Sequence, residues 1–395
     1  MRRATTVTAA SALAVLLILA GCAKPPKPGE PLSGLTPEEK TLFERGKGQF
    51  ATVFAPETGL GPVFNSDACA ECHEDPAAGG RGDEVEVHVA AFMPATGFCD
   101  PLVDKGGIVI QQKVTPALHT ALGIDSEPQP VEATAIAHRT TPDLLGFGLL
   151  DAIPDSTILA YADPDDRNHD GISGRPNRFF DGRLGRFGRK ALVPALNEFN
   201  AGAYVFEQGI TSPAVPTEET VGGQPIPAGV DPVPEPEINQ EALDLTNAFV
   251  RFLAPPAPQR LDAAGKRGQK LFSGIGCAGC HLPVLRTGDN PVQALRYKNV
   301  AAYTDLLLHD MGPELADICL GQATPSEFRT EPLMGLRFSN ASTGEGEPSF
   351  LHDGRARTIA DAIRMHGGEG AASRDKFAAL SDAERAALVK FLESL

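Results

Sequence analysis

The sequence predicts a mainly α-helical protein that consists of two similar modules, with long loops and little β structure. The main observation is a repeat: the string Cys-x-x-Cys-His occurs at 69–73 and again at 277–281. Each copy follows a helix-forming segment and a glycine-containing turn. With 41 glycines and 34 prolines among 395 residues, the connecting loops are expected to be long. This length is sufficient for two domains that each bury a hydrophobic core.

The N-terminus predicts an export signal over residues 1–21. Arg2 and Arg3 precede an apolar stretch that is too short for a membrane-spanning helix. The stretch ends in Leu-Ala-Gly-Cys22, which resembles the processing site of bacterial lipoproteins and implies that Cys22 is lipidated. The alternative is an ordinary cleavage site followed by a free cysteine. Residues 22–34 are proline-rich and predict a tether, so we expect a periplasmic protein held at the outer membrane by a lipid anchor only.

The net charge is −16, which argues against binding to nucleic acid because that requires a basic surface. An acidic surface is compatible with electrostatic steering of a basic redox partner, such as a small cytochrome or a cupredoxin. Alternatively, the charge serves only to keep the protein soluble.

The first predicted helix runs from Pro37 to about Phe50. Thr36 is suited to cap its N-terminus, proline occupies the first helical position, and Glu39 completes a capping box. A glycine-rich loop then leads into the first Cys-x-x-Cys-His string. The second string has the same preamble, with a predicted helix over 263–272 and a Gly-Ile-Gly turn.

Cys-x-x-Cys-His is the attachment signal for c-type haem. The two thiols add to the haem vinyl groups, and the adjacent histidine ligates the iron. A redox-active Cys-x-x-Cys or half of a zinc site is the alternative, but neither requires the histidine or a second copy. We therefore predict two covalently bound haem c groups in two cytochrome c-like modules. The attachment and ligand residues are Cys69, Cys72, His73, Cys277, Cys280 and His281.

Further echoes support an internal duplication. Arg-Thr-Thr-Pro-Asp-Leu-Leu-Gly at 139–146 resembles Arg-Thr-Glu-Pro-Leu-Met-Gly at 329–335. The chain ends in an amphipathic helix that begins with a Ser381–Glu384 capping box. Residues 212–238 are rich in proline, glycine and acids, which predicts a linker. The modules are accordingly placed at 35–211 and 239–395.

With these residues in view, the chain resembles the di-haem oxidoreductases often labelled thiol oxidoreductase-like or di-haem peroxidases, relatives of bacterial di-haem cytochrome c peroxidase. The resemblance covers nearly all of the mature chain. It rests on the strings at 145–155, 170–177, 308–312 and 351–355. In the peroxidase relatives a distal ligand follows the His-Asp-Gly motif by about fourteen positions. From His352 that count reaches His366, which is therefore expected to be the distal ligand of the second iron.

Four arginines are candidates to bind haem propionates, with ordinary surface solvation as the alternative: Arg329, Arg337, Arg355 and Arg357.

The distal side of the first haem has two interpretations. His88 lies fifteen residues after His73, near the place where the peroxidase relatives carry a removable distal histidine. The alternative is a surface histidine on the alternating stretch 85–89. The relatives' Gln/Glu motif over the open haem is not found, and the conceivable substitutes are Asp151, Glu198 and Glu207. The chain has no tryptophan, which rules out the tryptophan relay of those relatives.

Two further groups of residues carry predictions. Asp166, Asn168 and Asp170 have the spacing of a calcium-binding loop, although Asn177 stands where an EF-hand has its last glutamate. An acidic turn without an ion is the alternative. Cys99 and Cys319 remain after haem attachment and lipidation, and in an oxidising compartment they are expected to form a disulfide or to stay as two buried thiols.

Two functions follow from these residues. The first is an exported di-haem oxidoreductase that passes electrons between its haems and reduces a small oxidant such as hydrogen peroxide at the first. The second is a non-catalytic electron-transfer cytochrome in which both irons are six-coordinate. Homodimerisation is implied only by analogy with the peroxidase relatives.

Overall fold

The computed structural model describes residues 24–340 and 348–395. The predicted signal at 1–21 and the lipidation site at Cys22 lie outside these residues. No helix in the described part of the chain is long and apolar enough to cross a membrane.

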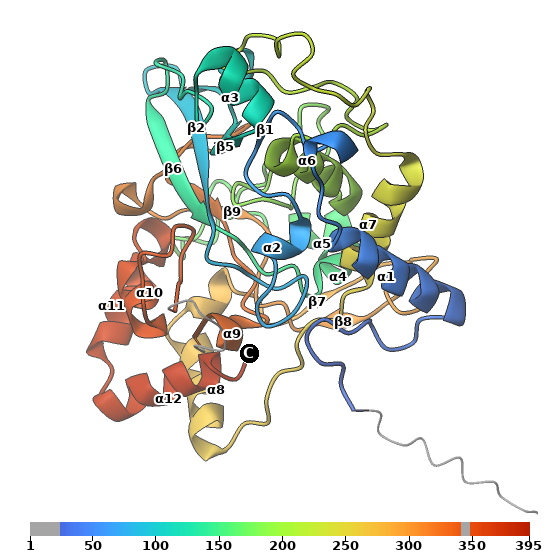
Figure 1. Cartoon of the computed structure of the whole chain (residues 1–395). Coiled ribbons are helices and arrows are strands. Elements are labelled where there is room, and N and C mark those ends of the chain that lie inside the picture. The colour runs from blue at the N-terminus through green and yellow to red at the C-terminus, as the bar shows by residue number, and fades with distance from the viewer. Residues whose placement is uncertain (1–23, 341–347) are drawn as a thin grey trace, which may run out of the picture.

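The predicted fold class is wrong: the protein is a mixed α/β structure, with 33% helix and 14% strand in several small sheets. The largest sheet contains β2 (Val85–Met93), β3 (Phe98–Asp100), β4 (Val109–Ile110) and β6 (Ala135–Thr140). β2 pairs antiparallel with β6 from Val85↔Thr140 to Ala90↔Ala135, and the two strands lie side by side in Figure 1. Val87 and Val89 of β2 are buried, which is the alternation expected of a half-buried strand.

Each Cys-x-x-Cys-His segment is preceded by a helix that packs against a second helix from later in the chain. α1 (Pro37–Phe50) packs against α7 (Gln240–Phe252), and α8 (Ala263–Gly274) packs against α12 (Asp382–Leu392). Both crossings need glycine, because a Cβ at Gly46 would collide with the Leu245 carbonyl and one at Gly268 with the Ala387 carbonyl. The partner of α1 in the first pair, α7, comes after the predicted linker at 212–238 in the sequence.

The capping boxes expected from the sequence are present. Thr36 and Glu39 form one at α1, and Ser381 and Glu384 form another at α12. The remaining helices are α2 (Cys69–Cys72), α3 (Pro116–Leu122), α4 (Phe147–Asp151), α5 (Asp155–Leu159), α6 (Leu196–Gln208), α9 (Leu336–Asn340), α10 (Ile359–Met365) and α11 (Ala371–Ala379). The short strands outside the largest sheet are β1 (Val63–Phe64), β5 (Lys113–Val114), β7 (Leu285–Arg286), β8 (Asn299–Val300), β9 (Leu308–Asp310) and β10 (Glu327–Arg329).

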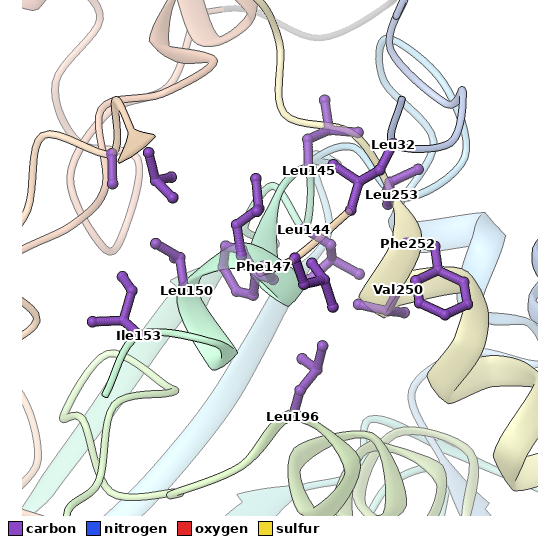
Figure 2. Close-up of a cluster of buried hydrophobic side chains, with 14 of the residues drawn as sticks. Leu32, Leu144, Leu145, Phe147, Leu150, Ile153, Leu196, Val250, Phe252 and Leu253 are labelled. Atoms are coloured by element: carbon purple, nitrogen blue, oxygen red, sulfur yellow. The ribbon is translucent and has the colours of Figure 1, made fainter. Parts of the chain in front are cut away.

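In the larger hydrophobic core, segment 144–153 packs against the end of α7, and residues between 285 and 307 also contribute. Figure 2 shows its labelled members: Leu32, Leu144, Leu145, Phe147, Leu150, Ile153, Leu196, Val250, Phe252 and Leu253. A second core joins α8, α10, α11 and α12 through Phe272, Ile359, Phe377 and Phe391. Each core thus lies beneath one Cys-x-x-Cys-His segment, and each buries the apolar face of the helix that precedes it.

Buried charges and a disulfide connect the two halves. Asp317 accepts a hydrogen bond from Arg139 at 2.8 Å and pairs with Lys190 at 2.8 Å, and all three side chains are almost inaccessible. Cys99 and Cys319 form a disulfide with a Cα–Cα distance of 5.8 Å across 220 residues of sequence. These contacts fix the sheet of the first half to segment 308–329 of the second.

Replacing Cys99 and Cys319 together by alanine is expected to lower the free energy of unfolding by about 2–5 kcal/mol, because the cross-link restricts the unfolded chain over a long loop. Chemical denaturation followed by circular dichroism measures the change. An unchanged midpoint in non-reducing buffer would contradict the expectation.

Candidate functional site

The second Cys-x-x-Cys-His segment presents its histidine for metal binding. It follows α8 through Gly276, whose φ of 104° requires glycine. The Nδ1 atom of His281 lies 3.0 Å from the Tyr303 carbonyl oxygen, so Nδ1 donates to that oxygen and Nε2 is left free for a metal. Burial lowers the pKa of His281 to about 4, which keeps the ring in the neutral form that a ligand requires.

His366 lines the same cavity as His281. It directly follows α10, and its Nδ1 atom lies 2.7 Å from the Ala362 carbonyl oxygen, which again leaves Nε2 free. Burial lowers its pKa as well. The neighbouring Met365 is 38% exposed and does not line the cavity. Of the two adjacent residues, the histidine is the one placed to ligate a group bound there.

The cavity has a volume of about 300 Å³ and an apolar wall. Its apolar lining comes from α8, from α10 and from segments 328–339 and 349–352: Phe272, Phe328, Leu333, Phe350, Leu351 and Ile363. Arg329 also lines it, with a side chain only 2% exposed. Its Nη2 donates to Glu331 at 2.6 Å, but Nε and Nη1 are buried without a partner. A carboxylate of the cavity's ligand could accept from this open edge, so these residues fit a haem with its propionate on Arg329.

The other three arginines considered for propionate binding are engaged elsewhere. Arg337 donates to the Leu395 carbonyl at 2.8 Å, Arg355 donates to the Glu314 carbonyl at 2.7 Å, and Arg357 is exposed. None of the three lines the cavity.

A buried imidazolium stands beside the second attachment site. His309, 3% exposed, lies between Asp305 at 2.8 Å and Glu369 at 2.7 Å, and its Nδ1 is 3.5 Å from the Sγ atom of Cys280. Burial alone would lower the pKa of His309, but its hydrogen bonds to Asp305, Cys280 and Glu369 outweigh burial and raise the pKa to about 12. Sequence reasoning used His309 only as part of a family string and missed this arrangement.

The first Cys-x-x-Cys-His segment repeats the geometry of the second. His73 follows α2, and its Nδ1 lies 3.0 Å from the Gly80 carbonyl oxygen, which leaves Nε2 free. The Phe50 ring lies 6.1 Å from the His73 ring, and Phe272 stands 6.4 Å from His281 in the second half. The histidine of each Cys-x-x-Cys-His segment is therefore oriented by a backbone carbonyl and lies near the last phenylalanine of α1 or of α8.

Carboxyl groups surround the first segment. Burial raises the pKa of Cys69 and of Cys72 to about 12, and Glu207 lies close enough to both thiols to contribute to this shift when it is ionised. Asn65 donates a hydrogen bond to Glu207 at 2.9 Å. Burial raises the pKa of Glu207 well above its ordinary value, and the nearby charge of Glu86 raises it further. Glu207 thus keeps its proton to a higher pH than an ordinary glutamate does.

The pKa of Glu86 is shifted in the opposite direction from that of Glu207. Burial would raise its pKa, but the hydrogen bond from His88 and the charges of His88, His73 and Arg139 outweigh burial and lower it. The His88 Nε2 atom lies 2.9 Å from Glu86, the His88 side chain is 12% exposed, and its Nδ1 is buried without a partner. Glu86 and His88 lie two residues apart on β2, on one face of the strand, a signal that the sequence contained.

The structure brings Glu207 to the first segment, whereas the other two predicted substitutes are used elsewhere. Asp151 accepts from the Leu196 amide at 3.0 Å and pairs with Arg251, while Glu198 pairs with Arg183 at the surface.

The predicted calcium loop is closed by its own hydrogen bonds. The Asp166 carboxylate accepts from the backbone amides of Asp170 at 3.0 Å and of Gly171 at 3.2 Å. Asn168 donates to Asp170 at 3.1 Å. Calcium at this exposed loop stays a prediction.

A family model described as "Di-haem oxidoreductase, putative peroxidase" matches residues 131–395, so the chain belongs to this family of di-haem redox proteins. The chain is also similar to a solved structure of Kuenenia stuttgartiensis hydrazine synthase pressurised with xenon, at 16% identity, covering 100% of this chain and 99% of that one, with a TM-score of 0.41.

A second solved structure is a MauG-like protein associated with microbial copper homeostasis, at 16% identity, covering 94% of this chain and 92% of that chain, with a TM-score of 0.40. No curated protein matches the sequence.

Proposed function

We propose that the chain is an exported di-haem c-type oxidoreductase that reduces hydrogen peroxide at the first haem. The observation that carries the proposal is the pair of carboxyl groups with opposite pKa shifts beside His73: Glu207 raised, Glu86 lowered. Such a pair provides a proton donor and a proton acceptor at one site. The haem, when bound, supplies the iron that binds the oxidant and delivers electrons.

The overall reaction consumes two protons and two electrons: hydrogen peroxide becomes two molecules of water. Glu207 holds a proton that it can give to the departing oxygen, and the buried position of its carboxyl favours this neutral form. Glu86, ionised and hydrogen-bonded to His88, can accept a proton from the incoming peroxide. The electrons come from a reduced small cytochrome or cupredoxin.

The second site is proposed as the entry point for electrons. His281 and His366 both line its cavity with a free Nε2 atom, so an iron ligated by both would have no open position for an oxidant. At this site the Nε and Nη1 groups of Arg329 are buried without a partner, which suits a group that carries negative propionates.

Export remains part of the proposal. The Cys99–Cys319 disulfide supports it, because such bonds persist in oxidising compartments and c-type attachment takes place outside the bacterial cytoplasm. Lipidation at Cys22 and attachment to the outer membrane extend the same proposal, and growth with a labelled fatty acid tests them.

One observation favours the second candidate, a non-catalytic electron-transfer cytochrome. His88 has a buried ring nitrogen without a partner on the strand that carries Glu86, and this atom could ligate the first iron. The iron would then be six-coordinate and closed to peroxide.

Spectroscopy of the purified protein distinguishes the two functions. We expect two covalent haems per chain by pyridine haemochrome assay, with one low-spin iron and one high-spin iron in the resting or half-reduced form. Peroxide should remove the high-spin signal. Two low-spin irons in every redox state, unaffected by peroxide, would support the electron-transfer cytochrome, and fewer than two haems would overturn both.

A further inference from the structure

Four carboxylates converge far in sequence from either Cys-x-x-Cys-His segment, all within the predicted linker at 212–238. Ligand oxygens of Glu218, Asp231, Glu235 and Glu237 all lie within 4.8 Å of one another. Three of these residues are half-buried and Glu235 is exposed. In the described part of the chain, no lysine, arginine or histidine forms an ion pair with any of the four. The like charges therefore repel one another without compensation from a basic side chain.

Unpartnered oxygens give an independent indication of a missing ligand. Both carboxylate oxygens of Glu218 and the Oε1 atom of Glu237 are sealed from solvent and have no hydrogen-bond donor. Burial, then the hydrogen bond that a protonated Glu218 makes with Glu235, and then the charges of the neighbouring carboxylates raise the pKa of Glu218 to about 10. Burying a carboxylate without a hydrogen-bond donor or a counter-ion costs free energy, so we expect a cation to bind beside these oxygens.

The surrounding backbone holds the carboxylates in place. The Thr211 amide donates to Glu237 Oε2 at 2.7 Å, and the fully buried Thr211 hydroxyl hydrogen-bonds to Glu235 and to Glu237. The Glu237 amide donates back to that hydroxyl at 3.2 Å. Glu235, being exposed, leaves an access route for a small ion.

We propose that Glu218, Asp231, Glu235 and Glu237 bind one calcium ion. Every ligand atom is a hard carboxylate oxygen, which suits calcium or magnesium and not zinc or copper. Calcium accepts irregular sets of six to eight oxygens, including bidentate carboxylates, whereas magnesium requires a small octahedron and retains water. Four carboxylates from separate points of a loop match the irregular set.

A bound ion would hold the two ends of segment 212–238 close together, next to the end of α6 and the start of α7. Thr211 lies three residues after α6, and Glu237 lies two residues before the N-cap of α7. Glu237 also packs against the loop that leads to the first Cys-x-x-Cys-His segment, since a Cβ at Gly59 would meet its Cβ at 2.9 Å. Calcium is therefore expected to stabilise this loop as well as the linker.

The test uses the full holoprotein, stripped with EGTA and then equilibrated with calcium chloride. The variant Glu218→Gln/Asp231→Asn removes two charges and keeps shape, and Asp166→Asn/Asp170→Asn is the matched control at the exposed acidic loop. We expect the first variant to bind one calcium fewer per chain than the wild type and to lose the calcium-dependent rise in melting temperature. The control variant should still bind the calcium ion at the four carboxylates and should keep the calcium-dependent rise in melting temperature.

In EGTA the cluster variant should melt no lower than the wild type, because it lacks the repulsion of the bare cluster. This comparison separates loss of the site from failure to fold. The proposal is overturned if the variant binds as much calcium as the wild type, if the wild type binds none, or if magnesium alone is retained. An ion-free cluster would then share protons among its carboxyls. None of these outcomes depends on peroxide reduction.

Discussion

Replacing His366 by alanine is expected to convert the second haem from low-spin to high-spin. The Nε2 atom of His366 is free because Nδ1 bonds to the Ala362 carbonyl, and the ring lines the cavity that His281 also lines. Alanine removes the ligand and leaves space for water, so the low-spin electron paramagnetic resonance signal of this haem should be lost completely. Optical and resonance spectra of the oxidised protein measure the change.

Met365 provides the matched control. It is the adjacent residue and the type of ligand usual at this place in the peroxidase relatives, but it is exposed. Met365→Leu should leave the spectra of both haems unchanged. His366→Met should restore a low-spin iron with a higher reduction potential, because a thioether ligand favours the ferrous state. A low-spin second haem in His366→Ala would disprove the assignment.

Features governed by local rules could be predicted from the sequence. The first helix was expected from Pro37 to about Phe50, and α1 has these bounds, because the capping box and the proline act within one turn. The helix before the second attachment segment begins at Ala263 as expected. The Cys-x-x-Cys-His strings are likewise local, since attachment and ligation need only five consecutive residues.

The sheet depends on contacts that no local pattern specifies. β2 was visible as the alternating stretch 85–89, but it was considered only as the setting of His88. Its partner β6 lies more than forty residues further along the chain, and their register is fixed by the burial of one face against the core. The expectation of a mainly α-helical fold was wrong for this reason.

The acid at the first site also depends on tertiary structure. Glu207 stands near the end of α6, and it meets Cys69 and Cys72 only because that helix packs beside β1 and the loop at 59–65. From the sequence it was one of three equivalent candidates. Folding distinguishes them, because it places Asp151 at a helix N-terminus and Glu198 in a surface ion pair.

Replacing Glu207 by glutamine is expected to slow peroxide reduction by about 10²–10⁴-fold, the usual contribution of a positioned general acid. Glutamine keeps the acceptor for Asn65 but has no acidic proton, so both haem spectra should stay as in the wild type. Stopped-flow mixing of the reduced protein with peroxide measures the rate. The control is Glu198→Gln, which lies nine residues before Glu207 on α6 and pairs with Arg183 at the surface. This variant should react at the wild-type rate.

The pH dependence tests the same role of Glu207. Because its pKa is raised in the folded chain, Glu207 keeps its proton to a higher pH than an ordinary glutamate, and activity should fall as pH rises through that raised pKa. The glutamine variant should lack this alkaline fall. A raised carboxyl pKa also lowers stability as pH rises above the ordinary value of 4.5, so the variant should gain stability relative to the wild type on the alkaline side. If the rate is unchanged while this stability gain appears, Glu207 is buried and protonated but takes no part in the reaction.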